Sequence, residues 1–448
     1  MKKILLILFI VAAFPLSAQY YQIQQDEGLI GGGLGVTWID GQPHYAMRFF
    51  PEFAFNNFGI GLDLKLEYDS NGKIRTENFN TTSDYLSIIR YLRYGQKNDP
   101  VYVRLGALDY ATLGHGSIMY MYNNSPGFDN RKIGMELDID FNYFGFESVY
   151  GNFGEAGLLG LRGYIRPLKV TELQNTPIIG NLEVGASVVT DFHGNAGVLS
   201  GFINDAKNGE FEALTDAGTI SIIGFDLGLP ILRTRLVDFD LYYDYAKIID
   251  YGSGSALGAI FKFKGFGVVD VWTKFERRWN GDQYIPAYFN SMYEIERFKF
   301  DRKDNAVRSK IQQLESMESV GDGFYGELLL RLVGTFNIIG SYQRLDDHPD
   351  SGILHLSADI TPEGSTYLAR AGYDKINIRD EKDLFKLDDR SYLFVEFGYK
   401  PMSYVIVSMV YNWTFTPERD ADDMVIGYKP QKKIEPRVSF VYPLNFGG

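Results

Sequence analysis

The chain has 448 residues, no cysteine and a formal net charge of -13. This acidic balance argues against a nucleic-acid partner, because phosphate binding needs a basic surface. The lack of cysteine excludes disulfides, thiolate metal sites and a lipid-bearing N-terminal cysteine. Aromatic residues make up 15% of the chain, with 33 Phe and 31 Tyr, and membrane barrels use such residues as girdles at both interfaces.

The N-terminus has the pattern of a secretory signal. Lys2 and Lys3 precede an apolar run, Ile4 to Ala13, and the small residues Ser17 and Ala18 follow. We therefore predict a signal peptide over 1–18, cleaved before Gln19, because the run is too short to span a bilayer. A short segment over 19–27 then leads into a single domain over 28–448.

Alternation of apolar and polar residues continues along most of this domain. In one segment the apolar set is Ile60, Leu62, Leu64, Leu66 and Tyr68, and the polar set between them is Asp63, Lys65 and Glu67. Side chains on a strand point to opposite faces with period two, so each segment has one oily and one charged face. A soluble sandwich would show the same alternation.

The connections between strands favour a transmembrane barrel. Long connections follow odd-numbered strands, beginning with the first strand at Gly28 to Ile39: they are Ser70 to Pro100, Asn124 to Lys132, His193 to Asp216, Trp279 to Asp322, Arg379 to Arg390 and Thr416 to Ile434. Short turns follow even-numbered strands, with Pro167 to Gly180 as the exception. The fold class predicted is all-β, an antiparallel outer-membrane barrel of about 20 strands (roughly 18 to 22), with short periplasmic turns and long extracellular loops.

Two stretches inside long connections have helical spacing. Leu86, Ile89 and Leu92 recur after a capping Ser83 or Asp84, before Gly95. The alternative for this stretch is a strand hairpin closed at Asn98 to Pro100. The second stretch carries Val307, Ile311 and Leu314 after Asp304. We predict that either helix folds into the barrel mouth as a constriction or covers the rim as a lid.

Charged residues recur on the inward face of the predicted strands, and acids outnumber bases. The residues predicted to line the lumen are Asp63, Lys65, Glu67, Glu136, Asp138, Asp140, Arg162, Arg166, Asp238, Asp240, Asp244, Lys262, Lys264, Glu327, Arg331, Arg370 and Asp374. Charges of both signs can pair across strands and fill a barrel, or they can line water. Both interpretations stay open.

Catalytic chemistry finds little support in the sequence. His115 lies between Gly114 and Gly116, where a flexible turn is a sufficient explanation. His355 and Ser357 share one face of a strand, but no acid is marked to orient the histidine, so a hydrolase triad is not supported. We predict no enzyme activity, no cofactor and no metal site.

These features together resemble outer-membrane barrels of Gram-negative bacteria. The residues that carry the resemblance are the signal ending Ser17-Ala18-Gln19, the absence of cysteine and the alternating strands. The segment Tyr91 to Tyr122 is similar to segments of large, uncharacterised, porin-like barrels of Bacteroidota-like bacteria. Such barrels usually end on an aromatic residue, and this chain departs from that pattern by ending Phe446-Gly447-Gly448.

The function predicted is therefore a porin-like channel for small polar solutes with a weak cation preference, in contact with outer-membrane lipid. The alternative is a closed structural or secretion-associated barrel that acts through its extracellular loops. A membrane-embedded hydrolase is the third possibility. Charged walls raise the local concentration of counter-ions, which is why an excess of inward acids predicts cation preference.

Overall fold

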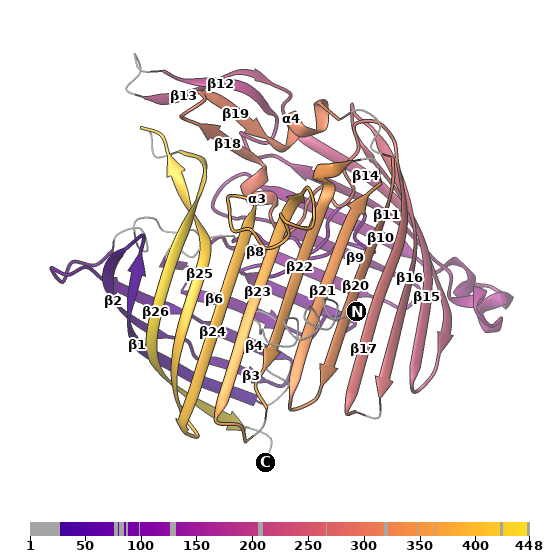
Figure 1. The fold of residues 1–448 in the computed structure, drawn as a ribbon. Helices are drawn as coiled ribbons and strands as arrows, with labels where there is room; N and C mark the ends of the chain where they lie inside the picture. Colours follow the sequence, from indigo (N-terminus) through magenta and orange to yellow (C-terminus); the bar gives the residue numbers. More distant parts are fainter. Residues whose placement is uncertain are drawn as a thin grey trace.

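The chain forms one closed antiparallel barrel in the computed structural model (Figure 1). The structure describes residues 27–75, 79, 85–86, 88–97, 99–125, 131–204, 209–265, 267–317, 321–346, 348–362, 364–421 and 424–445. The predicted signal peptide over 1–18, nearly all of the segment 19–27 and the C-terminal Phe446-Gly447-Gly448 lie outside these residues. The barrel closes where β1 pairs with β26, in a register that runs from Glu27 opposite Asn445 to Ile39 opposite Lys433.

The strands, in chain order, are β1 (Glu27–Ile39), β2 (Gln42–Phe49), β3 (Glu52–Phe55), β4 (Phe58–Leu62), β5 (Leu64–Tyr68), β6 (Ile89–Tyr94), β7 (Val101–Gly106), β8 (Gly134–Asp140), β9 (Phe144–Tyr150), β10 (Leu158–Ile165), β11 (Glu183–Asp191), β12 (Val198–Asn204), β13 (Glu210–Asp216), β14 (Ile220–Arg233), β15 (Val237–Ile248), β16 (Ser253–Gly265), β17 (Val269–Asn280), β18 (Phe298–Asp301), β19 (Ala306–Ser309), β20 (Asp322–Leu332), β21 (Phe336–Leu345), β22 (Gly352–Ile360), β23 (Tyr367–Ile378), β24 (Ser391–Met402), β25 (Val405–Arg419) and β26 (Val425–Asn445). The helices are α3 (Tyr293–Glu296), α4 (Lys310–Glu315) and the 3-10 turns η2 (Pro167–Val170), η3 (Glu172–Asn175), η4 (Ile179–Asn181) and η6 (Pro349–Ser351). No described helix is long and apolar enough to cross a membrane.

The barrel has 20 strands, as the sequence predicted. The sheet contains 22 strand segments, but β2 and β3 are two parts of one strand interrupted at Phe50-Pro51, and β4 and β5 are two parts of one strand interrupted at Asp63. The hairpins β12–β13 and β18–β19 are separate small sheets that stand above one end of the barrel in Figure 1.

The long connections lie at one end of the barrel and the short turns at the other. Residues 192–204, 209–219 and 281–317 lie at the first end, whereas the turns at 56–57, 234–236 and 333–335 lie at the second. Since extracellular loops of bacterial barrels are long and periplasmic turns short, the first end is extracellular. The connection between β10 and β11 is the predicted exception on the periplasmic side.

The outer face of the wall is apolar and exposed. Phe275, Leu257 and Leu328 on β17, β16 and β20 are about half exposed. Near the periplasmic turns, exposed aromatic rings form pairs across neighbouring strands: Phe58 with Tyr94, Tyr367 with Tyr399, and Tyr404 with Tyr442. An apolar band of this kind, bounded by rings at the interface, places the barrel in the outer membrane of a Gram-negative bacterium.

The helix predicted between Ser83 and Gly95 is wrong over Ile89–Tyr94, where the alternative strand hairpin is right. Ser83 and Asp84 lie outside the described residues, and Tyr85 and Leu86 are helical. Residues Ile89–Tyr94 form β6, which pairs with β4 and β7. The register shifts between Gly61 opposite Tyr91 and Leu62 opposite Ile89. This bulge turns both Ile89 and Leu92 outward at a spacing of three, which mimicked a helix in the sequence.

Two other expectations need different corrections. The long connection predicted from Thr416 to Ile434 is mostly strand, because β25 continues to Arg419 and β26 begins at Val425. The second predicted helix exists as α4, with a capping box between Ser309 and Gln312. Ile311 and Leu314 are fully buried, whereas Val307 belongs to β19.

Candidate functional site

The connection from β7 to β8 turns into the barrel. Leu108, Met119 and Tyr122 in this connection are almost completely buried. The inward turn begins at Gly106, whose φ is 120°, and a Cβ there would lie 2.4 Å from the carbonyl oxygen of Arg90. Only glycine fits this backbone conformation in contact with a neighbouring strand.

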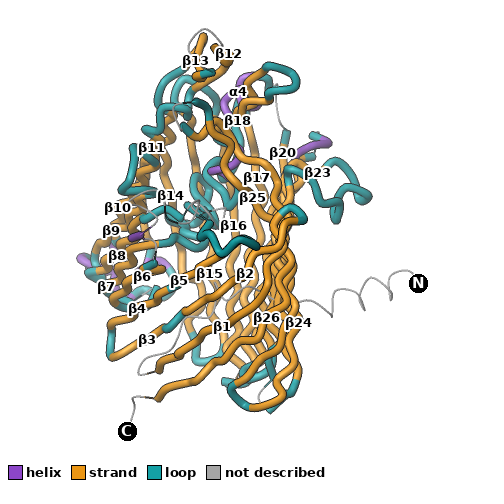
Figure 2. The backbone as a smooth tube through the Cα atoms, turned by 90° about the vertical axis from the view of Figure 1, so that its left-hand side faces the viewer, coloured by secondary structure: helices purple, strands orange, loops and turns teal. Residues whose placement is uncertain are grey.

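A second connection, from β17 to β20, joins the first inside the barrel. The Ala287 amide donates to the Ser117 carbonyl at 2.9 Å, and the Phe289 amide donates to the Ile118 carbonyl at 3.1 Å. The Tyr120 amide donates to the Phe289 carbonyl at 3.0 Å. We call residues 107–122 and 284–297 together the insert. Figure 2 shows loop segments, drawn in teal, inside the ring of orange strands.

Polar contacts attach the insert to one side of the wall. His115 Nδ1 lies 2.8 Å from Asp244 Oδ1 on β15, and the Ser117 hydroxyl donates to the same carboxylate. The Gly114 amide donates to Glu147 on β9 at 2.7 Å. Tyr120 donates to Glu327 on β20. Carboxylates of three strands therefore hold this part of the insert.

Lys274 on β17 supplies a positively charged contact at the centre of this attachment. Its ammonium donates to the His115 carbonyl at 2.5 Å and lies 2.8 Å from Glu276. The rings of Tyr120 and Tyr325 face the same ammonium at 4.1 and 5.2 Å. Aromatic rings stabilise a desolvated cation by their quadrupole, so Lys274 is held by charge and by ring faces together.

The opposite side of the wall also contacts the insert. The ring of Tyr110 lies 5.2 Å from that of His355 on β22, and the Ser291 hydroxyl donates to Asp374 on β23 at 3.2 Å. Since β23 lies across the barrel from β9, whose Glu147 holds Gly114, the insert spans the interior from wall to wall.

An apolar core fills the space between the insert and part of the wall. Inward side chains of β9, β10, β11, β14 and β15 pack against insert residues in one cluster, which includes Val149, Leu158, Val189, Ile222, Ala246, Leu113, Ile118, Met119, Tyr288 and Phe289. The sequence analysis predicted a charged interior and missed this core. Its signal is the apolar residues at inward positions near the extracellular ends of these strands, such as Val189 on β11 and Ile220 and Ile222 on β14.

A buried ion network joins the insert to the extracellular end of β11. Arg297 donates to Asp191 at 2.6 Å and to both oxygens of Glu294, at 2.8 and 2.6 Å. Lys132 also donates to Glu294, and Tyr122 donates to it at 2.7 Å. Burial alone would raise the pKa of Glu294, but the charges of Arg297 and Lys132 outweigh it and lower that pKa to about 2.

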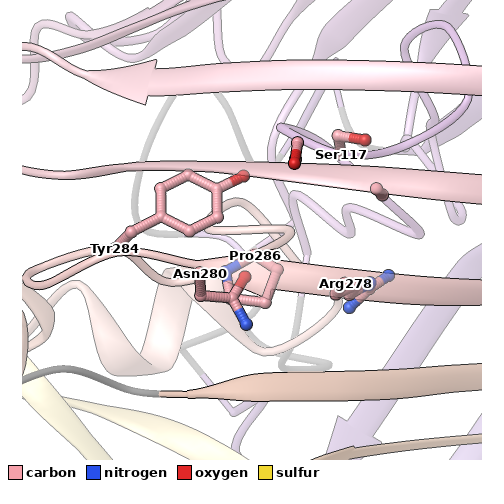
Figure 3. Close-up of a pocket in the computed structure, with 7 residues that line it drawn as sticks. Ser117, Arg278, Asn280, Tyr284 and Pro286 are labelled. Carbon is pink, nitrogen blue, oxygen red and sulfur yellow. The ribbon is translucent and has the colours of Figure 1, made fainter.

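A small cavity remains where the insert meets β16 and β17. Figure 3 shows the residues around it: Ser117, Tyr284 and Pro286 come from the insert, and Arg278 and Asn280 come from β17. The cavity volume is about 10 Å³, which is enough for a single water molecule. Solutes therefore find no site at this contact.

Most residues predicted to line the lumen have ionic partners on neighbouring strands or on the insert. Around β5 and β8, Asp63 pairs with Arg48 and Arg131, Lys65 with Glu67, and Glu136 and Asp138 with Lys97. Around β10, Arg162 pairs with Glu147, Glu183 and Asp226, and Arg166 pairs with Asp140 and Glu183. These pairs leave few uncompensated charges on this part of the wall.

The other predicted residues follow the same pattern. Asp238 pairs with Lys264, Asp240 with Arg233, Asp244 with His115, Arg331 with Asp270, Arg370 with Asp359, and Asp374 with His355. Glu327 accepts from Tyr120 and Tyr325. Lys262 is half-buried on β16. Their role in lining a conducting lumen stays a prediction.

Two histidines differ from what the sequence indicated. His115 is not simply part of a flexible turn, because Asp244, 129 residues away, holds its ring. His355 does have an acid partner: its Nδ1 lies 2.7 Å from Asp374 Oδ1, on the strand directly opposite. Ser357 lies nearby on β22 with a buried hydroxyl that has no hydrogen-bond partner among the described residues. Sequence separation hid both pairs.

A chain of alternating charges follows the wall on the side of β22 to β26. Arg370 lies 3.3 Å from Asp359 and 3.7 Å from Glu396. Arg437 lies 2.8 Å from Glu396 and 3.7 Å from Glu435. Lys65 lies 3.9 Å from Glu435 and 2.7 Å from Glu67. We call these seven residues the charge ladder. Its Arg370 and Asp359 side chains are 27% and 24% exposed, so water reaches this end of the ladder, whereas Glu396, Glu435 and Glu67 are buried.

The contact of His115 predicts a pH response. Burial lowers the pKa of His115, but the charge of Asp244 and its hydrogen bond raise it more, so the net pKa is above its ordinary value. Asp226 also raises it, Arg162 lowers it, and Tyr242 stacks on the ring at 4.2 Å. The stabilisation is thus complete below the unfolded pKa of about 6.5 and is lost as pH rises through the higher folded value.

We expect the ionic current through the refolded barrel to rise as the pH increases above about 6.5, because His115 then loses its proton and the insert loosens. His115→Gln should remove most of this response and leave the current near its high-pH level. Current measured at constant ionic strength tests this. An identical pH profile in both proteins would show that His115 does not control the attachment.

Comparison with known proteins gives matches in structure only. No family model matches the chain, and no curated protein matches its sequence. Among solved structures, OccK5 (OpdH) of Pseudomonas aeruginosa is 13% identical, with 93% of this chain and 97% of that chain covered and a TM-score of 0.33. OprD of the same bacterium is 11% identical, with 97% and 100% covered and a TM-score of 0.32.

The match to a mutant of the ferric enterobactin receptor PfeA, also of P. aeruginosa, has 7% identity, 94% and 81% coverage and a TM-score of 0.34. At such low identities and TM-scores, the likeness says nothing of what this chain binds or passes. A Bacteroidota-like source stays a prediction.

Proposed function

We propose that the chain is a porin-like channel that passes small polar solutes across the outer membrane. The observation that supports this best is the charge ladder, a row of alternating acids and bases on the inner wall that is partly exposed at Arg370 and Asp359. Such a wall interacts with polar solutes and offers nothing to apolar ones. Small solutes would pass along the ladder, because the apolar core closes the other side of the interior.

The proposed ion preference is weak and cationic. Acids outnumber bases in the ladder, where Asp359, Glu396, Glu435 and Glu67 face three bases. Because each acid is close to a base, the net electric field along the ladder is small, and the proposed preference for cations is weak.

Reversal potential under a salt gradient tests both proposals. We expect a modest cation preference, and we expect Glu396→Gln with Glu435→Gln to shift the reversal potential toward anions, less so at high salt because of screening. Asp240→Asn is the matched control, since Asp240 lies away from the ladder and pairs with Arg233. A reversal potential that the double variant leaves unchanged would contradict the proposed path.

A closed structural or secretion-associated barrel is the second candidate. The insert favours it, because the interior is bridged from wall to wall and packed with apolar side chains. In that case the extracellular hairpins β12–β13 and β18–β19 would carry the function. Absence of current both in the native chain and after shortening of the insert would support this candidate.

A further inference from the structure

The long periplasmic connection between β10 and β11 carries large apolar side chains that are substantially exposed. Val170 is 74% exposed, and Leu173, Ile178 and Ile179 are between 42% and 47% exposed. The turns η2 and η3 contain no buried residue, and η4 buries only Gly180. We call residues 167–182 the foot. Its apolar side chains are available to a partner outside the barrel.

The backbone of the foot is strained at one of these side chains. Ile178 has φ 70° and ψ -71°, a conformation that a β-branched residue rarely adopts. The neighbouring Gly180 amide donates to the Thr176 carbonyl at 3.1 Å and closes the turn around it. Because this strained turn leaves Ile178 and Ile179 exposed, a contact outside the chain would have to offset its cost.

The position of the foot identifies the surface that it meets. Ile165, the last residue of β10, faces outward and is 52% exposed, and it continues the lipid-facing row into the foot. Arg166 donates to the Asn142 carbonyl at 3.0 Å, and Lys169 donates to the Asn142 side chain. These bonds tie the foot to the turn that carries the exposed rings Phe141 and Phe144, part of the periplasmic girdle.

Neighbouring strands extend beyond the foot with apolar side chains still facing outward. The turn η4 lies against β14, and β14 continues to Arg233 with Leu232 43% exposed. Figure 1 shows a short coiled segment of matching colour standing outside the ring of strands. The foot is therefore at the level of the lipid-facing wall rather than beneath the barrel.

We propose that the foot lies in the periplasmic leaflet of the outer membrane, with Val170, Leu173, Ile178 and Ile179 at the boundary between headgroups and acyl chains. The partner is a phospholipid surface, because the foot is continuous with a face that already meets lipid. Amphipathic segments with an apolar face and polar residues beside it bind membranes in this way. The inference rests on the membrane location of the barrel and not on conduction.

The test uses the absence of native cysteine. Val170→Cys is labelled with an environment-sensitive fluorophore, and the barrel is refolded in phosphatidylcholine–phosphatidylglycerol vesicles. We expect blue-shifted emission, strong quenching by lipids that carry a nitroxide near the headgroup, and weak quenching by aqueous iodide. Leu173→Cys should behave in the same way and provides a second reading should the first variant fold poorly. Heat-modifiable migration confirms folding of each protein.

Two control variants give the reference signals for a label in lipid and for a label in water. Leu328→Cys on the lipid-facing wall gives the membrane value, and Asp250→Cys in an exposed extracellular turn gives the aqueous value. Labels at positions 170 and 173 that respond to iodide as strongly as the label at 250, with no quenching by nitroxide lipid, would overturn the proposal. The foot would then face the periplasm, where its apolar side chains are open to a periplasmic protein.

Discussion

Arg297→Leu is expected to destabilise the folded barrel by about 3–5 kcal/mol, the cost of leaving buried charges without their partner. Arg297 is 5% exposed and is the group that joins Asp191 to Glu294. Without it, the two buried carboxylates would keep one cation among the described residues, Lys132 on Glu294, besides hydrogen bonds from two tyrosine hydroxyls and the His193 amide. The free energy of unfolding in vesicles, from a urea titration followed by heat-modifiable migration, measures the loss.

Arg308→Leu is the matched control in the same connection. Its side chain is 60% exposed and pairs with Asp304 and Asp301. Exposed pairs contribute roughly 0–1 kcal/mol, so this change should be almost neutral. Equal losses for the two arginines would mean that the ion network does not hold the insert to β11.

Leu328→Arg is expected to destabilise the barrel by about 2–4 kcal/mol, because a charge would face the middle of the bilayer. Leu328 is 48% exposed at the centre of β20, on the outer face. The same unfolding titration measures this. Val333→Arg, in the periplasmic turn, should cost only about 0–1 kcal/mol because it lies at the interface.

Equal effects at positions 328 and 333 would place the lipid boundary elsewhere on the wall. Leu328→Met is a further control, since it keeps the side chain apolar and should change stability very little. The pair of arginine variants therefore tests the depth of the barrel in the membrane, and the methionine variant tests for local packing effects.

The barrel itself could be predicted because its pattern is local. Period-two alternation depends only on neighbouring residues, as in Ile60 to Tyr68, and it marks a lipid-facing row directly. The alternation of long and short connections then gave the strand number and the orientation. Boundaries were less predictable: β25 and β26 rise beyond the membrane, where polar residues such as Glu418 and Lys429 belong to strands and look like loop.

The incorrect prediction of a helix over Ile89 to Leu92 has a definite cause. A bulge in β6 places Ile89 and Leu92 on one face at a spacing of three. Sequence alone cannot locate a bulge, because the extra residue is defined by the partner strand. The alternative hairpin, closed near Asn98 to Pro100, was the correct interpretation.

The interior could be predicted only in part. Charged residues of the inward face were recognisable, but their partners were not: Arg162 and Asp226 lie 64 residues apart, and Tyr120 and Glu327 lie 207 apart. The insert was not predicted, because its contacts with the wall also join residues that lie far apart in the sequence. Leu113, Ile118 and Met119 are hydrophobic residues in a connection that would be polar if it were exposed. Apolar residues at inward positions of β14, such as Ile222, were the sequence feature that indicated where this connection packs.

Conductance of the refolded barrel in planar lipid bilayers, with the native insert and with residues 109–121 replaced by a short Gly-Ser linker, tests the central claim most directly. We predict small currents through the native chain and a several-fold larger conductance for the shortened one, with the residual ion preference set by the charge ladder. Heat-modifiable migration of both proteins confirms that each is folded. Equal conductance in the two proteins, or none in either, would contradict the claim that the insert narrows a channel.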